Sequence, residues 1–469
     1  MQDSLSFIAP AESAVGAFLP FITSYEQTLD GAIPIGVEFR TNQIVWFDPV
    51  GWMRKGYAFN KIVGILGKIG HRKTTLAKYI AVMYGSGLAN DGGLMRIYAD
   101  QVRRNDQFPE YDSLARFNDS TPVATTERIN IFDPAFSLTM SDHLTTAYDV
   151  FARSNDEAQA DAATAHVIQV ALAKMMNEHK SAMSMEVLAL LLSRYTVEDS
   201  RTYRKVVLEG TLDKRLGSLP DSVRNVIANE ADNLDKESLE SAASLAYQRY
   251  MRLLEGDFSE RFGGTVSMAD RMQQQAVIMD MAGLNDQTLA FMQSFIWRVK
   301  KRAFLTQDRR FTYQIEIHDE NYKMWNYLDY AREMSDYMKQ IRGYDSIVLF
   351  MTHRLQDYAT VGTVNSRQRV LATNMVQDIG SWFLGYQSLQ SALALCDTIG
   401  ITEAEARSLT SLRPGQWMLK VGSRPGVFID TNYIIGDTMM DLTASNMTND
   451  RAYAIQQGLA FDEDEEEDE

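Results

Sequence analysis

The stretch from Gly67 to Thr75 has the residue types and the spacing of a loop that binds phosphate groups. It reads GKIGHRKTT and fits the pattern G-x-x-x-x-G-K-S/T except at Arg72, where the pattern has its second glycine. In such a loop backbone N–H groups surround the phosphates, the lysine ammonium neutralises them, and the next hydroxyl binds Mg²⁺. The stretch therefore predicts a site for ATP and Mg²⁺, with Thr74 as a metal ligand. Its expected binding residues are Gly67, Gly70, His71, Arg72, Lys73, Thr74 and Thr75.

Arg72 decides whether this loop can work. If the position needs a positive φ, a residue other than glycine costs about 1–2 kcal/mol in strain. A guanidinium near the phosphates would return about 1.5–3 kcal/mol through charge-assisted hydrogen bonds. Because the two effects are comparable, we expect the substitution to shift nucleotide affinity rather than abolish it. The alternative is an arginine that lies in the phosphate site and blocks it.

The residues on either side of the loop have the composition that the motif requires. Residues 61–66 (KIVGIL) form a short apolar run, and residues 75–83 (TLAKYIAVM) have helical composition. A strand, a glycine-containing loop and a helix in this order are the context of a phosphate-binding loop. A surface turn with a chance cluster of basic residues is the alternative interpretation.

Hydrolysis also needs carboxylates at the end of a neighbouring strand, one to hold Mg²⁺ through water and one to orient the attacking water. Residues 276–280 (AVIMD) offer one acid, Asp280, whereas residues 313–320 (YQIEIHDE) end in the adjacent pair Asp319-Glu320. We assign metal binding to Asp319 and water activation to Glu320, although the second strand is polar for the centre of a sheet. The alternative is that these acids merely favour the start of a helix.

Composition narrows the class of protein. The chain has 469 residues, 45% of them hydrophobic and 23% charged, enough for about two to three domains. No apolar run approaches the ~18 residues of a membrane span, and the first residues do not resemble a secretory signal, so we expect a cytoplasmic protein. The single Cys396 and six scattered histidines give no disulfide framework and no metal-ligand spacing.

The charge argues against a protein that coats nucleic acid with its outer surface. The formal net charge is −16, and it is −8 without the acidic run at residues 462–469. A local basic segment remains at residues 297–311 (WRVKKRAFLTQDRRF), where six basic residues alternate with aromatic ones. This composition suits contact with DNA. The alternative, which we favour, is a helix C-terminus at which cations are stabilised.

The order of apolar patterns predicts an α/β fold with an inserted helical block. Short apolar runs alternate with helical segments before about residue 140 and after about residue 265, which indicates a mainly parallel sheet covered on both faces. Between them, apolar residues recur in helical steps of three and four. We expect an N-terminal segment (1–34), the first part of the nucleotide-binding core (35–140), an all-α insertion (141–265), the second part of the core (266–440) and a C-terminal segment with the acidic tail (441–469).

Seven segments in one order resemble the ATPases of conjugative type IV secretion systems, the TraC-like branch of the HerA/FtsK group, and in particular the short actinobacterial kind. They extend over about residues 35 to 435. In order they are FDPVGWMRKG, GKIGHRKTTLAK, Asp100 with Glu110-Tyr111, INIFDP, AVIMDMAGL, SIVLFMTHRLQDY and RPGQWMLKV. The resemblance implies a RecA-like P-loop NTPase fold.

The resemblance also implies a function. Members of this family use ATP hydrolysis to build or drive a channel that exports DNA and protein, usually as homo-hexamers bound to membrane-embedded channel proteins at the inner face of the cell membrane. By the same resemblance His353 would sense the γ-phosphate and Arg354 would complete a neighbouring subunit's site, with Arg424 as a weaker candidate. Two other functions stay open: a double-stranded DNA translocase, and a nucleotide-binding structural subunit with little hydrolysis.

Overall fold

The structure is a computed structural model that describes most of the chain between residues 32 and 435. The described residues are 32–89, 95–101, 111–123, 127–153, 160–195, 236–255, 257–264, 271–280, 284–305, 313–319, 321–343 and 346–435. The chain divides into two compact units: residues 1–123, 274–283 and 309–469 form the first, and residues 124–273 and 284–308 form the second. Within the described ranges, no helix has both the length and the apolar character of a membrane span.

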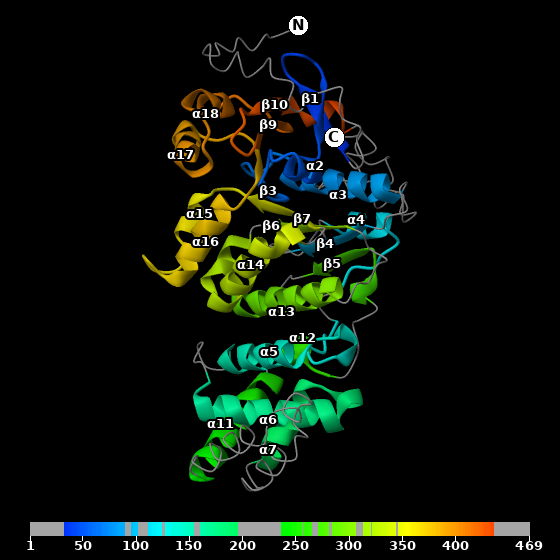
Figure 1. Cartoon of the computed structure of the whole chain (residues 1–469), viewed down its shortest axis with the longest axis vertical. Helices are drawn as coiled ribbons and strands as arrows, with labels where there is room; N and C mark the ends of the chain where they lie inside the picture. The colour runs from blue at the N-terminus through cyan, green and yellow to red at the C-terminus, as the bar shows by residue number, and fades with distance from the viewer. Residues whose placement is uncertain are drawn as a thin grey trace, which may run out of the picture. The chain divides into compact units, whose positions relative to one another are not determined.

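A ten-stranded sheet forms the first unit. The strands lie in the order β2-β1-β10-β9-β8-β3-β7-β6-β4-β5, and the labelled strands can be followed in Figure 1. The six strands from β8 to β5 are parallel to one another, and β9, β10, β1 and β2 continue the sheet from β8 through antiparallel pairs. The strands are β1 (Ile33–Glu38), β2 (Ile44–Phe47), β3 (Ile62–Leu66), β4 (Met95–Gln101), β5 (Ala276–Asp280), β6 (Tyr313–Asp319), β7 (Ser346–Thr352), β8 (Ser381–Leu384), β9 (Gln416–Val421) and β10 (Val427–Asp430).

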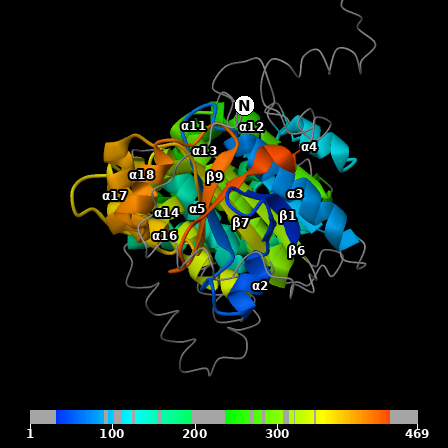
Figure 2. The ribbon, with the colours of Figure 1, turned by 90° about the horizontal axis from the view of Figure 1, so that it is seen from above.

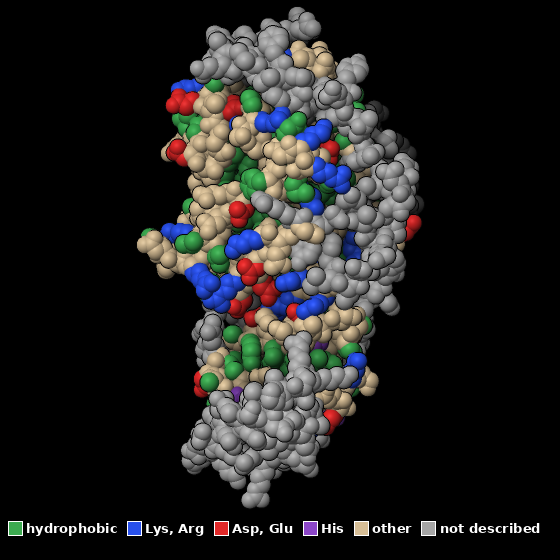
Figure 3. Space-filling view, viewed as in Figure 1, with side chains coloured by type: hydrophobic (Ala, Val, Ile, Leu, Met, Phe, Trp, Pro, Cys, Tyr) green, Lys and Arg blue, Asp and Glu red, His purple; other side chains and the backbone are tan. Residues whose placement is uncertain are grey.

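Helices cover both faces of this sheet, as expected for parallel strands. Figures 1 and 2 agree in placing α3 (Lys73–Ala89) and α4 (Asp112–Phe117) on one side of β7, and α14 (Leu328–Gln340) and α16 (Arg367–Gln377) on the other. Figure 3 shows acidic and basic side chains intermingled over α14, where ion pairs three residues apart join them. The remaining helical elements of this unit are α2 (Pro49–Arg54), η4 (Asn321–Asn326), η5 (Ile341–Gly343), α15 (Gln356–Ala359), α17 (Leu389–Ile399), α18 (Glu403–Leu409) and η6 (Thr431–Tyr433).

The core of the first unit lies around β3 and β7. Every residue of both strands is buried, because each strand has a neighbour on both sides and helices above and below. Gly64 is required at the centre of β3, since a Cβ there would lie 2.2 Å from the ring of Trp382 on β8. This tight packing fixes the strand that leads into the phosphate-binding motif.

The described elements of the second unit are all helical, and this unit includes residues 141–265, for which the sequence predicts an all-α insertion. On α11, Ala243, Ala246 and Tyr250 are buried, which agrees with the helical stripe in the sequence. The helix at 286–305, which the sequence assigned to the second part of the core, belongs to this unit as α13. The elements are η1 (Pro134–Phe136), α5 (Met140–Arg153), α6 (Ala162–Glu178), η2 (Lys180–Ala182), α7 (Met185–Tyr195), α11 (Lys236–Leu254), α12 (Asp257–Phe262), η3 (Arg271–Gln273) and α13 (Asp286–Leu305).

Candidate nucleotide-binding site

The glycine-containing stretch forms the loop between β3 and α3, so its context is the strand, loop and helix that the sequence predicts. Gly70 has φ 79° and nothing within 4 Å of a Cβ built on it, and Arg72 has φ 67°. Both residues therefore adopt the left-handed backbone conformation, which only glycine tolerates without strain. The loop ends at the N-terminus of a 17-residue helix, whose dipole favours a negatively charged group at that end.

Lys73, the first residue of α3, is directed back into the loop. Its side chain is buried, and Nζ donates hydrogen bonds to the carbonyls of Gly67 at 3.0 Å and Lys68 at 3.4 Å. Nζ also lies 2.7 Å from Nδ1 of His353. The same Nδ1 lies 3.1 Å from the carbonyl of Gly67, so the ring of His353 contacts both the lysine and the backbone of the loop. The structure thus brings together Lys73 and His353, which the sequence named separately.

The sheet explains why these residues meet. β3 and β7 are parallel neighbours with Leu66 opposite Thr352, so the residues that follow the two strands emerge at one edge. The N–H of Gly67 donates to the carbonyl of Thr352 at 3.3 Å and closes the gap between the two strand ends. Thr74, partly exposed, and Thr75, buried, follow Lys73 in the first turn of α3.

Asp319 lies at the same edge of the sheet. It is the last residue of β6, which pairs with β7 in parallel so that Asp319 lies opposite Met351. With neighbouring strands about 4.8 Å apart, β6 lies about 10 Å from β3, a distance that a hydrated metal ion and a phosphate can span. Glu320 follows Asp319 and lies outside the described residues, so its position stays a prediction.

The competing acid, Asp280, ends the outermost strand of the sheet. β5 is separated from β3 by β7, β6 and β4, which places its backbone about 19 Å from β3. That separation is too large for a side chain of β5 to share a metal ion with the loop. The topology therefore favours the acid pair of β6 over Asp280.

The polar character of β6 has a structural reason. Gln314 and Glu316 are buried, and Glu316 Oε1 accepts hydrogen bonds from the Gln314 amide at 2.6 Å and from the hydroxyl groups of Tyr337 at 2.5 Å and Ser346 at 3.2 Å. Burial is the main cause that raises the pKa of Tyr337 well above its usual range, and the nearby Glu316 adds to it. β6 can lie inside the sheet despite these polar side chains, because α14 and β7 supply hydrogen-bond partners for them. The sequence could not reveal these distant partners.

His71 does not direct its side chain toward the phosphate-binding face of the loop. The ring is buried, packs edge-on against Trp417 with 4.7 Å between centroids, and has Nε2 2.9 Å from the carbonyl of Gln416 and 3.2 Å from the amide nitrogen of Tyr386. Burial lowers the pKa of His71, so the ring is neutral near pH 7. The expected role of His71 in nucleotide binding is therefore confined to its backbone.

The arginine that replaces the second glycine is directed out of the loop as well. Arg72 is exposed, and its Nη1 donates to Oδ1 of Asn432 in η6 at 2.5 Å. The guanidinium is thus bound to the segment that follows β10. In this conformation it neither blocks the loop nor points at a phosphate.

The two candidate arginine fingers differ in their surroundings. Arg354 follows His353 and has an exposed side chain. Arg424 lies in the turn between β9 and β10, where its guanidinium stacks on the ring of Tyr57, 3.4 Å from the centroid. Because an arginine finger must reach another subunit, the exposed Arg354 is the better candidate.

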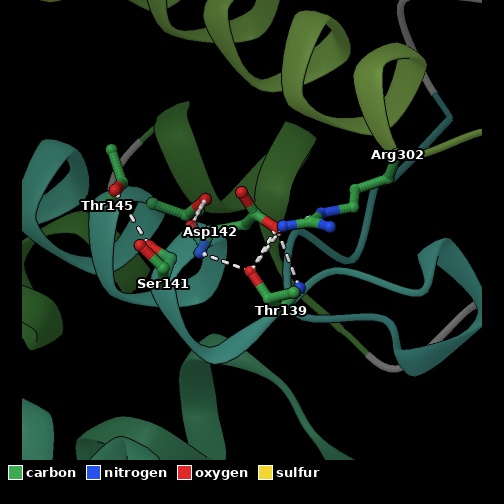
Figure 4. A network of polar contacts seen from close by, with 6 residues as sticks. Thr139, Ser141, Asp142, Thr145 and Arg302 are labelled. Atoms are coloured by element: carbon green, nitrogen blue, oxygen red, sulfur yellow. Dashed lines mark hydrogen bonds and ion pairs between the residues drawn. The ribbon is translucent and has the colours of Figure 1, made fainter. Parts of the chain in front are cut away.

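In the basic segment at 297–311, most of the side chains named below are buried or form ion pairs within the second unit. Arg298 of α13 forms a buried ion pair with Asp149 of α5, and Arg302 donates from Nε to Asp142 at 2.5 Å (Figure 4). Trp297 and Lys300 are buried too. These residues therefore favour the helix-packing interpretation over contact with DNA, while residues 306–311 lie outside the described ranges.

The donor set fits a nucleoside triphosphate with Mg²⁺. The loop offers backbone N–H groups at a helix N-terminus, an open approach at Gly70, a lysine ammonium, a threonine hydroxyl, and a carboxylate two strands away. No cluster of three metal-binding side chains occurs in the part of the chain that the structure describes.

Comparison with known proteins shows the fold. No protein-family model and no curated protein sequence matches this chain. Among solved structures, VirB4 of Thermoanaerobacter pseudethanolicus is 16% identical with a TM-score of 0.58, over 87% of this chain and 98% of that one. The plasmid coupling protein TrwB, in complex with the non-hydrolysable GTP analogue GDPNP, is 13% identical with a TM-score of 0.51, over 81% and 86% of the two chains. These similarities confirm the predicted RecA-like P-loop NTPase fold with a mainly parallel sheet.

Proposed function

We propose that this protein is an ATP-hydrolysing motor of a conjugative type IV secretion system. The observation that carries the proposal is the contact between Lys73 and His353, at the sheet edge where Asp319 also ends. A loop lysine, a polar residue after the neighbouring strand and an acid after the next strand are what phosphoryl transfer to water requires. VirB4 and TrwB share the fold, and the TrwB structure contains a GTP analogue.

Each residue has a distinct task in this proposal. The N–H groups of the loop and Lys73 would bind the phosphates, and Thr74 and Asp319 would hold Mg²⁺. Bound Mg²⁺ would neutralise charge on the β- and γ-phosphates. Glu320 orients the attacking water, and His353 must exchange its bond with Lys73 for one with the γ-phosphate. Arg354 extends toward a neighbouring subunit.

The finer features of the proposal rest on the resemblance in the sequence. They are membership of the TraC-like branch, a homo-hexamer, attachment to membrane-embedded channel proteins at the inner face of the cell membrane, and the export of DNA or protein. A nucleotide-binding structural subunit is the second candidate, because Arg72 holds a backbone conformation that disfavours side chains. No contact in the described residues favours a double-stranded DNA translocase.

Lys73→Ala tests the proposal. We expect the affinity for ATP, measured by calorimetry with Mg²⁺, to fall by at least ~100-fold because the charge that neutralises the phosphates is lost. Lys68→Ala is the matched control: it removes a lysine of the same loop whose ammonium lies over the ring of Tyr386, and its affinity should stay within about threefold of the parent. Equal ATP affinity in Lys73→Ala and the parent would rule out the nucleotide-binding loop.

A further inference from the structure

Arg72 occupies a backbone conformation that its side chain disfavours, and the structure shows what holds it there. Its φ of 67° lies in the left-handed region, as at Gly70 two residues earlier. The hydrogen bond from Nη1 to Oδ1 of Asn432 joins the loop to a residue 360 positions later in the chain. This contact ties the guanidinium to a defined residue, so it can be tested by substitution.

The side chain of Asn432 is oriented toward Arg72 by its own hydrogen bonds. Its backbone N–H donates to Oδ1 of Asp430 at 2.9 Å, and its Nδ2 donates to the carbonyl of Pro414 at 3.1 Å. The second bond identifies the amide nitrogen, so Oδ1 is the atom that faces Arg72. Gly415 makes room: it has φ 84°, and a Cβ there would lie 2.3 Å from Oδ1 of Asn432.

The neighbouring residue of the loop is fastened to the same part of the fold. His71 contacts the carbonyl of Gln416 and the ring of Trp417, both at the start of β9. A Cβ at Gly385 would lie 2.2 Å from the His71 ring, so a second glycine leaves space for a second loop side chain. Both residues before Lys73 thus bind the segment from β8 to η6 rather than the interior of the loop.

We propose that Asn432 is a positioning residue that holds Arg72 in the left-handed conformation and thereby does the work of the missing glycine. The expected effect of Asn432 on nucleotide binding rests on the proposed function. Its expected effect on stability rests on the contact with Arg72 and does not depend on that function. In this proposal, the side chain of Arg72 helps to set the backbone conformation of the loop and does not bind phosphate directly.

A double-mutant cycle on Arg72→Gly and Asn432→Ala tests the pair. We expect Asn432→Ala to weaken the affinity for mant-ADP with Mg²⁺ about fivefold in the parent and less than about 1.5-fold in the Arg72→Gly background, where glycine needs no restraint. The bond to Pro414 is lost in both backgrounds and cancels. Asn432→Asp keeps an acceptor for the guanidinium but loses the donor to Pro414, so it should weaken the affinity less than Asn432→Ala does.

The same cycle on thermal unfolding separates this inference from the proposed function. Asn432→Ala should lower Tm by about 2 °C more in the parent than in the Arg72→Gly background. Equal losses of Tm in the two backgrounds, or no loss in either, would overturn the positioning role. If the parent bound no mant-ADP, the proposed function would fail, and the Tm cycle would still decide the role of Asn432.

Discussion

Lys73 and His353 lie at the centre of the candidate site. Lys73 follows β3 through the loop and His353 follows β7 directly, so the two residues meet because these strands are parallel neighbours. The motif in the sequence identified Lys73, and the family resemblance identified His353, but only the parallel pairing of β3 and β7 explains a 2.7 Å contact between them. His71 and Arg72 were predictable as loop residues. Their partners Gln416 and Asn432 were not, because the separation in sequence exceeds 340 residues and no local pattern records such a contact.

Glu320→Gln should separate binding from turnover. The glutamine keeps the size of the side chain but cannot orient and activate water as a carboxylate does, so ATP affinity should persist while steady-state turnover falls by at least ~100-fold. Asp280→Asn serves as the control, since β5 lies at the far edge of the sheet, and its turnover should equal that of the parent. Turnover in Glu320→Gln equal to that of the parent would move the catalytic role to another residue.

Among the elements of the sheet, the strands that the sequence predicts most readily are those made of apolar residues. β3 and β7 were recognisable because every residue in the first and nearly every one in the second is apolar, as in a strand buried on both faces. β6 was the difficult strand, since its buried Glu316 depends on hydroxyl groups of α14 and β7. The sequence pattern places residues 286–305 in the second part of the core, whereas α13 belongs to the second unit, because helical periodicity does not reveal which unit a helix packs against.

His143 of α5 should make the stability of the second unit depend on pH. Burial lowers the pKa of His143 from its ordinary 6.5 to about 4, and Asp142 offsets this only in part. The folded protein thus holds the ring neutral while the unfolded chain takes up a proton, so stability is lost as pH falls from about 6.5 toward 4, by up to about 3 kcal/mol.

His143→Leu should remove this dependence. We expect the free energy of unfolding in urea to change less between pH 7 and pH 5 in the variant than in the parent, since an apolar side chain has no proton to gain. His179→Leu, at the less buried C-terminal end of α6, should keep the parent's pH dependence. An unchanged pH dependence in His143→Leu would show that other groups cause it.

For the molecule as a whole, we expect an assembly of several copies. The exposed Arg354 lies next to the residue that contacts Lys73, so a neighbouring copy could be completed by it, as the family resemblance implies. The sequence leads to this expectation through an ordered set of segments, and the similarity to VirB4 bears on the fold alone.

Steady-state ATP turnover per chain, measured with Mg²⁺ across a wide range of protein concentration, tests most directly whether this protein is an ATP-hydrolysing motor. A motor whose sites are completed by neighbouring copies should hydrolyse ATP slowly when dilute and gain turnover per chain as it assembles, whereas Lys73→Ala should stay inactive throughout. Tight ATP binding without turnover at any concentration would contradict the motor and leave a structural nucleotide-binding subunit.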